Sequence, residues 1–597
     1  MVRSKALEAE PRFRPRVLRD YALLADGERG ALIGPEGDIA WMCAPRWHSD
    51  AVFSTLIGGA GTYAVTPSDP RYVWGGAYEP GTLIWRSRWV SGDALIKCRE
   101  ALAFPGDPAR AVLLRRVCAR KGACRVSVLL EPRAAFGHYA GTNHLSRHDG
   151  VWTAHSGPLH WRWTGGWDAH TEGHTRLSGA ILSLDLDIAE GGFHDLVLEL
   201  SDAPLPRESP DPEALWQTTE LAWKRSGSDT SDTIAPREAD HAQAVLRGLT
   251  SGTGAMVAAA TMALPEQEES PRSYDYRYAW IRDQCYAGIA AAAVGATDLL
   301  DRAVAFITDR LLQDGPRLRA AYTVTGAPVP DEYVLDLPGY PGGTDRVGNW
   351  VNQQFQLDVF GEVMQLLATA AGLDRLDRDA ANALRVAVDI VGKHWDEPEA
   401  GIWELHDRRW THSRLSCLAG LRRAAALPGA GRDLPHAAAL ADAILARTSQ
   451  TCTHPDGYWQ RAPDDPRPDA SLLLPPVRGA LPADDPRTVA TLAAVRAQLT
   501  DEGYVYRYHH GGHPLGDTEG AFLLCGFTMA LAEHQQGNEV RAMHYFERTR
   551  SACGPAGLFS EEYDPAQRQL RGNLPQAFVH AVFLECAASL GHQPSIR

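Results

Sequence analysis

Between about residues 20 and 225, apolar and polar positions alternate over short segments, the pattern of half-buried β-strands. Many of these residues are β-branched or aromatic, and Gly, Pro, Asp and Ser separate the segments. The pattern predicts strands at residues 61–65, 82–90, 111–117, 125–130, 159–163 and 181–186. We therefore expect a large antiparallel β-sandwich at residues 15–225.

Beyond residue 238 the apolar positions follow a helical period. The small polar residues at 226–238 indicate a linker. Helices are predicted at residues 298–312, 353–371, 379–395, 435–447, 488–499, 520–536 and 576–590, among roughly a dozen in all. Long loops rich in Trp, Arg, Asp and Glu separate them, which predicts a ring of paired helices with a pocket built by loops at one end. The fold class is thus an α+β multidomain protein whose helical domain spans residues 239–597.

Composition narrows the class of ligand. Apolar residues make up 44% and charged residues 22% of the chain, as in a globular protein, and no apolar run approaches the ~20 residues of a membrane span. The net charge of -15 and the scattered basic residues disfavour nucleic acid. We expect a cytoplasmic protein, because residues 1–10 lack the apolar core of a secretory signal and the ten Cys show no CxxC pair.

Two short acidic segments carry the candidate chemistry. Residues 401–404 read GIWE and residues 558–564 read LFSEEYD, so each places a carboxylate beside an aromatic residue in a predicted loop. Hydrolysis of a glycosidic bond needs one carboxylic acid to protonate the departing oxygen and one carboxylate to activate water. If the second segment is extended, Glu561 and Glu562 point to opposite sides and only one of them faces a sugar.

A third segment, RSYDYRYAWIRDQ at residues 272–284, runs into an Ala-rich helix. It resembles the DYRYxWxRD motif of glycoside hydrolase family 15, the glucoamylase and bacterial trehalase family. Residues 339–362, 506–522 and 572–578 resemble further motifs of that family, and residues 31–46 resemble the trehalase-like N-terminal domain of its intracellular members. The resemblance covers the chain from about residue 20 to about residue 590 and implies that the helical domain is an (α/α)6 barrel.

The resemblance implies roles for individual residues. Glu404 would be the general acid, with Trp403 as an apolar wall beside it, and Glu561 the general base. Such a pair acts with inversion, which requires carboxyl groups about 6.5–9.5 Å apart. Residues implied to bind the sugar are Tyr276, Tyr278, Trp280, Arg282, Asp283, Arg346, Asn349 and Arg507. Core packing for the aromatic residues, and ion pairing for the charged ones, stay open as alternatives.

The predicted function is exo-hydrolysis of a small soluble α-glucoside, either trehalose or a malto- or isomalto-oligosaccharide, with release of β-glucose. No cofactor or metal is expected, because the Gly residues within 509–513 do not hold its His residues at helical spacing. The sequence departs from the family after the acid, where Leu405 and residues 411–423 differ from the usual pattern, so the leaving group is left open. A disaccharide phosphorylase, a catalytically silent sugar-binding protein and a homo-oligomeric state also stay open.

Overall fold

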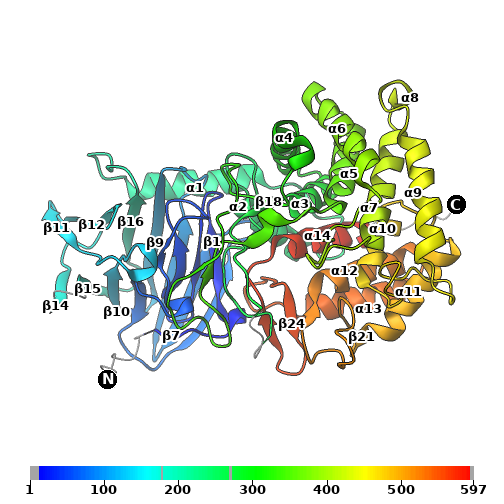
Figure 1. Cartoon of the computed structure of the whole chain (residues 1–597). Helices are drawn as coiled ribbons and strands as arrows, with labels where there is room; N and C mark the ends of the chain where they lie inside the picture. Colours follow the sequence, from blue (N-terminus) through cyan, green and yellow to red (C-terminus); the bar gives the residue numbers. More distant parts are fainter. Residues whose placement is uncertain (1–12, 176–178, 268–271, 592–597) are drawn as a thin grey trace, which may run out of the picture.

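The computed structural model describes residues 13–175, 179–267 and 272–591. Figure 1 shows strands gathered on one side of the molecule, in blue and cyan, and helices on the other, from green to red. All ten Cys are free thiols. Within the described ranges, no helix combines the length and the apolar character that crossing a bilayer requires.

The N-terminal region consists of three sheets in which the paired strands are antiparallel. The first runs β1-β2-β3-β4, with strands Ala22–Ala25, Gly30–Ile33, Ile39–Cys43 and Ala51–Phe53, all of them buried. The second has the order β14-β15-β10-β5 and comprises His170–Thr175, Gly179–Ile188, Cys124–Glu131 and Thr62–Pro67. The third has the order β11-β12-β13-β16-β9-β8-β7-β6 and comprises Asn143–His148, Val151–Ser156, Leu159–Thr164, Phe193–Ser201, Arg110–Lys121, Ala94–Leu102, Trp85–Ser91 and Val73–Tyr78.

Helix α1 (Pro212–Ser226) lies along the sheets and contacts β16 (Figure 1). Asp211 caps its N-terminus through the backbone N–H of Glu213, and Pro212 occupies the first turn, where its missing N–H costs nothing. Trp216, Thr219 and Trp223 are buried at spacings of three and four residues, so a single face of the helix meets the sheet. This helix falls in a stretch where the pattern indicated only strands.

The remaining helices form a second region. They are α2 (Pro236–Leu249), α3 (Ile281–Ala293), α4 (Thr297–Asp314), α5 (Asp358–Gly372), α6 (Arg378–His394), α7 (Thr411–Ala425), α8 (Ala430–Asp433), α9 (Ala437–Cys452), α10 (Leu474–Val477), α11 (Pro486–Gln498), α12 (Leu523–Gln535), α13 (Glu539–Arg550) and α14 (Ala577–Gly591). Helix contacts run in a closed order: α3 to α5, α7, α10, α12 and α14, and from α14 back to α3. Helices α2, α4, α6, α9, α11 and α13 each contact a member of that series.

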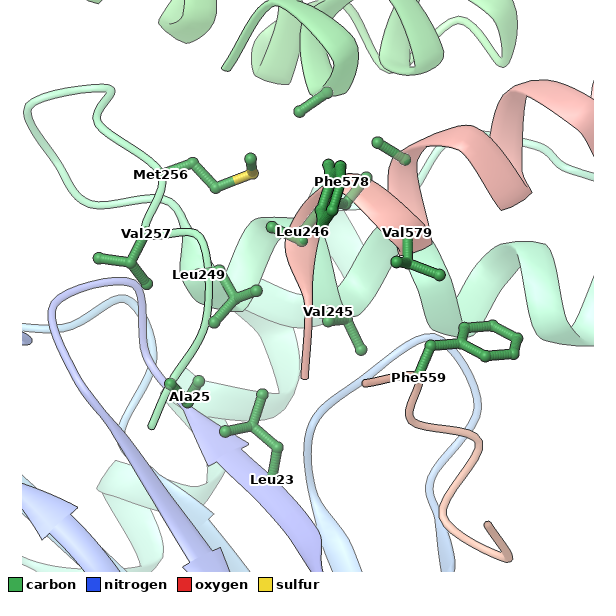
Figure 2. Packing of buried hydrophobic residues seen from close by; sticks show 14 of the residues in the cluster. Leu23, Ala25, Val245, Leu246, Leu249, Met256, Val257, Phe559, Phe578 and Val579 are labelled. Atoms are coloured by element: carbon green, nitrogen blue, oxygen red, sulfur yellow. The ribbon is translucent and has the colours of Figure 1, made fainter. Parts of the chain in front are cut away.

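The two regions share a packed apolar junction. Figure 2 shows Leu23 and Ala25 of β1 facing Val245, Leu246 and Leu249 of α2, beside Phe578 and Val579 of α14. Leu23 and Leu249 have no exposed surface. The Trp41 indole N–H also donates to the carbonyl of Ala260 at 2.9 Å. The core is therefore continuous between the strands and the helices, so the N-terminal sheets support the helical region directly.

Every strand predicted above overlaps an observed one, and every helix predicted above by its residue range has a counterpart. Among the helix starts, those of α5 and α12 differ most from the prediction. Residues 350–353 form a short 3-10 helix before α5, and residues 521–522 form a strand, β23 (Ala521–Phe522), before α12. Residues 411–421 of helix α7 are all buried, so this helix lacks the amphipathic period that marks the helices named from the sequence.

A buried ion pair in the N-terminal region leads to the first prediction. Arg115 and Glu100 are 2.8 Å apart with no exposed side-chain surface, and Arg115 stacks over the ring of Tyr63. Arg115→Met leaves the Glu100 carboxylate buried without its partner, which we expect to cost about 3–5 kcal/mol in urea unfolding.

The neighbouring pair between Arg125 and Asp187 provides the control, because both side chains are exposed. Arg125→Met should leave the unfolding midpoint nearly unchanged. Adding Glu100→Met to Arg115→Met should recover most of the lost stability. Equal destabilisation by the two single variants would contradict this reading of the core.

Candidate active site

A cavity of about 140 Å³ lies where loops from the start, the middle and the end of the helical part of the sequence meet. Its wall comes from the segment that leads into α3, the loop before α5, the turn before α7 and the segments flanking α12 and α14. The lining residues are Glu266, Arg272, Tyr274, Tyr276, Arg282, Asn349, Trp350, Ile402, Trp403, Glu404, Leu405, Arg507, Tyr508, Phe522, Glu561 and Phe578. Both predicted catalytic carboxylates are thus in the same cavity wall.

Glu404 projects into the cavity from a tight turn. Its backbone is left-handed, with φ of 53°, and the turn closes through a hydrogen bond from the Glu404 N–H to the carbonyl of Gly401. A left-handed conformation costs a non-glycine residue roughly 1–2 kcal/mol, so the surrounding structure must hold it. The Trp280 indole N–H donates to Glu404 Oε1 at 2.7 Å, and Arg282 lies 3.5 Å from the same oxygen. These contacts fix the direction of the carboxyl group.

Glu561 faces the cavity immediately before strand β24 (Glu562–Asp564). Its side chain is largely buried, and the Tyr276 hydroxyl donates to its Oε1 at 3.1 Å. Burial, and then the negative charge of Glu266, raise the pKa of Glu561 well above its usual range. Glu562 points away from the cavity and accepts hydrogen bonds from the Gly520 N–H at 2.7 Å and from Arg507 at 3.3 Å.

An aromatic pair separates the two carboxylates. The rings of Tyr276 and Trp280 meet edge to face, with centroids 5.4 Å apart. Trp280 holds Glu404 and Tyr276 holds Glu561, so each carboxylate is held by one member of this aromatic unit. Two carboxyl groups that face the same cavity can divide the work of hydrolysis, one as an acid and the other as a base.

A buried ion pair positions this aromatic unit. Arg277 contacts Asp275 at 2.6 Å, and neither side chain has more than 1% exposed surface. Arg277 also donates to the carbonyl of Ser49 and lies over the ring of Trp41 in the N-terminal region. Asp275 in turn accepts from the Gly348 N–H at 3.0 Å. The side chains that flank Tyr276 are therefore anchored outside the cavity, while Tyr276 faces it.

The other predicted sugar-binding residues are divided. Arg282, Asn349, Trp403 and Arg507 line the cavity with Tyr276, and Trp280 contacts it through Glu404. Tyr278 is buried against Ala258 and Val329, and Asp283 is buried beside Arg282, where burial raises its pKa to about 7. Arg346 is half-exposed and pairs with Glu332 at 3.2 Å. The structure does not place these last three on the cavity wall, and direct contact with a sugar stays a prediction for them.

Several lining residues were not singled out from the sequence. Tyr274 and Arg272 lie within the motif that supplied Tyr276, while Phe522 and Phe578 lie within other family-like segments, so the motifs carried a signal for them. Trp350 follows Asn349 and is 40% exposed at the cavity. Glu266 precedes the motif, and no local pattern distinguished it from an ordinary loop carboxylate.

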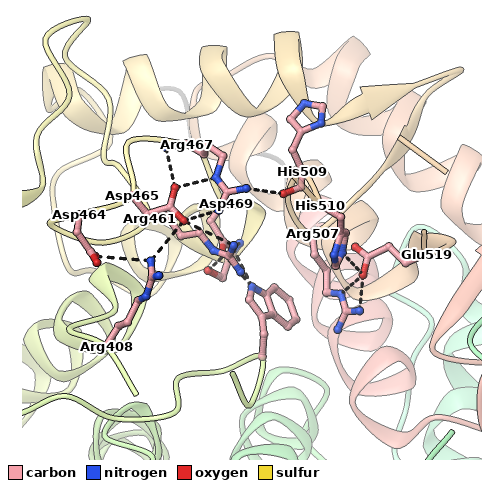
Figure 3. A network of polar contacts seen from close by, with 12 residues as sticks. Arg408, Arg461, Asp464, Asp465, Arg467, Asp469, Arg507, His509, His510 and Glu519 are labelled. Carbon is pink, nitrogen blue, oxygen red and sulfur yellow. Dashed lines mark hydrogen bonds and ion pairs between the residues drawn. The ribbon is translucent and has the colours of Figure 1, made fainter. Parts of the chain in front are cut away.

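A polar network holds the wall that carries Arg507 and Trp403 (Figure 3). Glu519 lies 2.8 Å from His510, and Arg507 donates to it at 3.1 Å through Nε. Asp469 accepts from the Trp403 indole N–H at 2.9 Å and from Arg461. The Arg461 guanidinium lies 3.5 Å from the ring centroid of Tyr508. In the described part of the chain, no group of three or more His, Cys, Asp or Glu side chains is arranged to hold a metal ion.

Glu519 gives a pH-dependent prediction. Burial alone would raise its pKa, but the charge of Arg507 and the hydrogen bonds from His510 and Arg507 outweigh burial and lower it to about 2. A carboxyl whose pKa is depressed on folding stabilises the fold above its unfolded pKa, and this contribution is lost as the pH falls towards the folded value. We expect the free energy of unfolding to decrease between about pH 4.5 and pH 2 in part through Glu519.

In Glu519→Gln, the free energy of unfolding should decrease less between about pH 4.5 and pH 2 than in the wild type. Urea unfolding at a series of pH values measures this difference. Glu547→Gln, at an exposed pair with Arg550, serves as the control and should keep the wild-type slope. Identical acid dependence in wild type and Glu519→Gln would show that Glu519 does not supply it.

The sequence and the fold of this chain are similar to those of known proteins. Residues 241–588 match the model of glycosyl hydrolases family 15, and residues 14–200 match the trehalase-like N-terminal model. The chain is 30% identical to proteins named trehalase from Mycobacterium tuberculosis and Mycolicibacterium smegmatis, over 95% of its length and 88% and 90% of theirs. A solved bacterial glucoamylase complexed with acarbose shares the fold, with a TM-score of 0.69 at 16% identity over 97% of this chain and 96% of that one. The chain is a glycoside hydrolase and belongs to glycosyl hydrolases family 15.

Proposed function

We propose that the protein is an inverting, exo-acting α-glucoside hydrolase that releases β-glucose. The observation that carries this proposal is the pair of carboxylates that face one cavity, each held by one member of the Tyr276–Trp280 unit. Glu404 protonates the departing oxygen, and Glu561 removes a proton from the water that attacks the sugar from the other side. This mechanism requires a separation of about 6.5–9.5 Å between the two carboxyl groups, which we predict for Glu404 and Glu561.

Trehalose is the leading candidate substrate because the two relatives at 30% identity are named trehalases. Malto- and isomalto-oligosaccharides stay as the other candidates. The small cavity supports exo action, since it suits one terminal sugar and is well below the ~300–1,000 Å³ of pockets for larger ligands. Leu405 lies in the cavity wall, so an apolar residue follows the acid at a place where it can influence the leaving group.

The proposal includes the architecture that presents the site. We propose a β-sandwich at residues 15–225, a linker at 226–238 and an (α/α)6 barrel at 239–597. The closed order of contacts through α3, α5, α7, α10, α12 and α14, with further helices packed against α3, α5, α7, α12 and α14, supports the barrel. A cytoplasmic location stays a prediction.

Two other functions make different use of the same cavity. A disaccharide phosphorylase would replace the activated water by phosphate and would not need Glu561 as a base. Glu561 is buried in the cavity wall and held by Tyr276, which favours hydrolysis. A catalytically silent sugar-binding protein would bind the sugar in the same cavity but would show no turnover, with or without the two carboxylates.

The test is glucose release from trehalose, maltose, isomaltose, kojibiose and nigerose. Glu404→Gln and Glu561→Gln should each lower kcat by about 10²–10⁴-fold, because each removes one proton-transfer group while preserving shape. Asp407→Asn, at an exposed carboxylate three residues after Glu404, should leave kcat unchanged.

The alternatives give distinct results. A requirement for phosphate with glucose 1-phosphate as product would establish the phosphorylase. A wild-type protein inactive on the whole panel would favour the silent binding protein.

A further inference from the structure

We propose that Glu266 is a positioning residue for the base: it shares one proton with Glu561 and, while protonated, donates a hydrogen bond to the second carboxyl oxygen of Glu561. The inference rests on the proposed function, because it assigns a role relative to the base of that reaction. It adds a third carboxyl group to the two that perform the proton transfers.

Glu266 is built into the cavity beside Glu561. Its side chain lines the same wall, and the residue is 4% exposed. The Pro265 carbonyl accepts from the Gly572 N–H at 2.7 Å, which attaches this segment to the hairpin that follows Glu561. Gly572 has a φ of 76°, and a Cβ atom there would lie 3.4 Å from Glu561 Oε2 and 4.0 Å from Glu266 Cγ. The glycine therefore lets the two carboxyl groups approach each other.

The hydrogen bonding of Glu561 requires a proton between the two groups. Its Oε1 accepts from the Tyr276 hydroxyl, whereas its Oε2 is buried and has no hydrogen-bond donor among the described residues. The Glu266 carboxyl lines the same wall beside it, and we assign the missing hydrogen bond to that group. Two ionised carboxylates are both acceptors and cannot form such a bond, so one of them must carry a proton.

Electrostatics agree with this geometry. Burial raises the pKa of Glu266, and burial together with the charge of Glu266 raises the pKa of Glu561. Two carboxyl groups in such contact titrate as a pair and keep one proton between them over a broad range of pH. The other titratable or charged groups that interact with Glu266 or Glu561 are Arg272, Tyr274, Tyr276, Asp283, Arg507, Glu519 and Glu562.

The charge of Glu266 raises the pKa of Glu561, so the shared proton can reside on either group, and the site is competent in the form that carries it on Glu266. Donation from Tyr276 stabilises the ionised form of Glu561, and a general base must be ionised to accept a proton from water. During hydrolysis the water loses a proton to Glu561 as its oxygen bonds to the anomeric carbon, and Glu404 gives its proton to the departing oxygen. The Glu266 proton is not transferred, and its role is to hold the Glu561 carboxylate in place.

Glu266→Gln tests this role, because an amide is a neutral donor that can neither gain nor lose a proton in this range. The substrate is α-glucosyl fluoride, whose leaving group needs little protonation, so that the pH dependence reports the base and not Glu404. We expect Glu266→Gln to keep kcat within about threefold of wild type at the optimum, since one neutral donor replaces another. Wild-type kcat/KM should fall at high pH as the shared proton is lost, and Glu266→Gln should lack that fall.

Glu266→Ala removes the donor and should lower kcat by about tenfold to a hundredfold, with a smaller change in KM. Glu208→Gln, at an exposed carboxylate in the N-terminal region, is the matched control and should reproduce the wild-type profile. If Glu266→Ala does not fold, the pH profile of Glu266→Gln decides alone.

Two results would overturn the proposal: a Glu266→Gln profile with the wild-type fall at high pH, or a loss of kcat in Glu266→Gln as large as in Glu561→Gln. Failure of the proposed function looks different. In that case the wild-type protein itself would hydrolyse neither the fluoride nor any disaccharide in the panel.

Discussion

The buried ion pair between Asp275 and Arg277 is the constraint on which the site depends. Both side chains are withdrawn from solvent, and Arg277 reaches the N-terminal region through Ser49 and Trp41. Breaking one half of such a pair typically costs about 3–5 kcal/mol, because an unpaired charge stays buried. The pair spans Tyr276 in sequence and thereby directs that residue into the cavity. The N-terminal sheets consequently contribute to the active site without lining it.

The chemistry of the cavity follows from burial of acidic groups. Burial disfavours the ionised forms, so each carboxylate that stays charged needs a donor or a cation. Glu519 has Arg507 and His510, which keep it charged. Glu404, the proposed acid, contacts Trp280 and Arg282. Glu561 has Tyr276 for one oxygen and the Glu266 carboxyl for the other. The site thus separates a proton donor from a proton acceptor by giving the two carboxyl groups different partners.

The fold and the core of the site could be predicted because their signals are local. Alternation and helical period located the strands and most helices, and the motif around Tyr276 contained four residues of the cavity wall. Other features depend on contacts between distant segments. The buried α7 has no amphipathic face to detect. Tyr278 lies within the same motif as Tyr276 and yet packs into the core. Glu266 acquires a role only because Gly572 and Glu561 are folded against it.

The central claim, that Glu561 activates water opposite Glu404, is tested most directly by the anomeric form of the first product. Hydrolysis of trehalose followed by NMR before mutarotation should show α- and β-glucose in equal amounts, because the attacked sugar inverts and the departing sugar keeps its α configuration. A first product that is α-glucose alone would mean retention, and would contradict the assignment of Glu561 as the base.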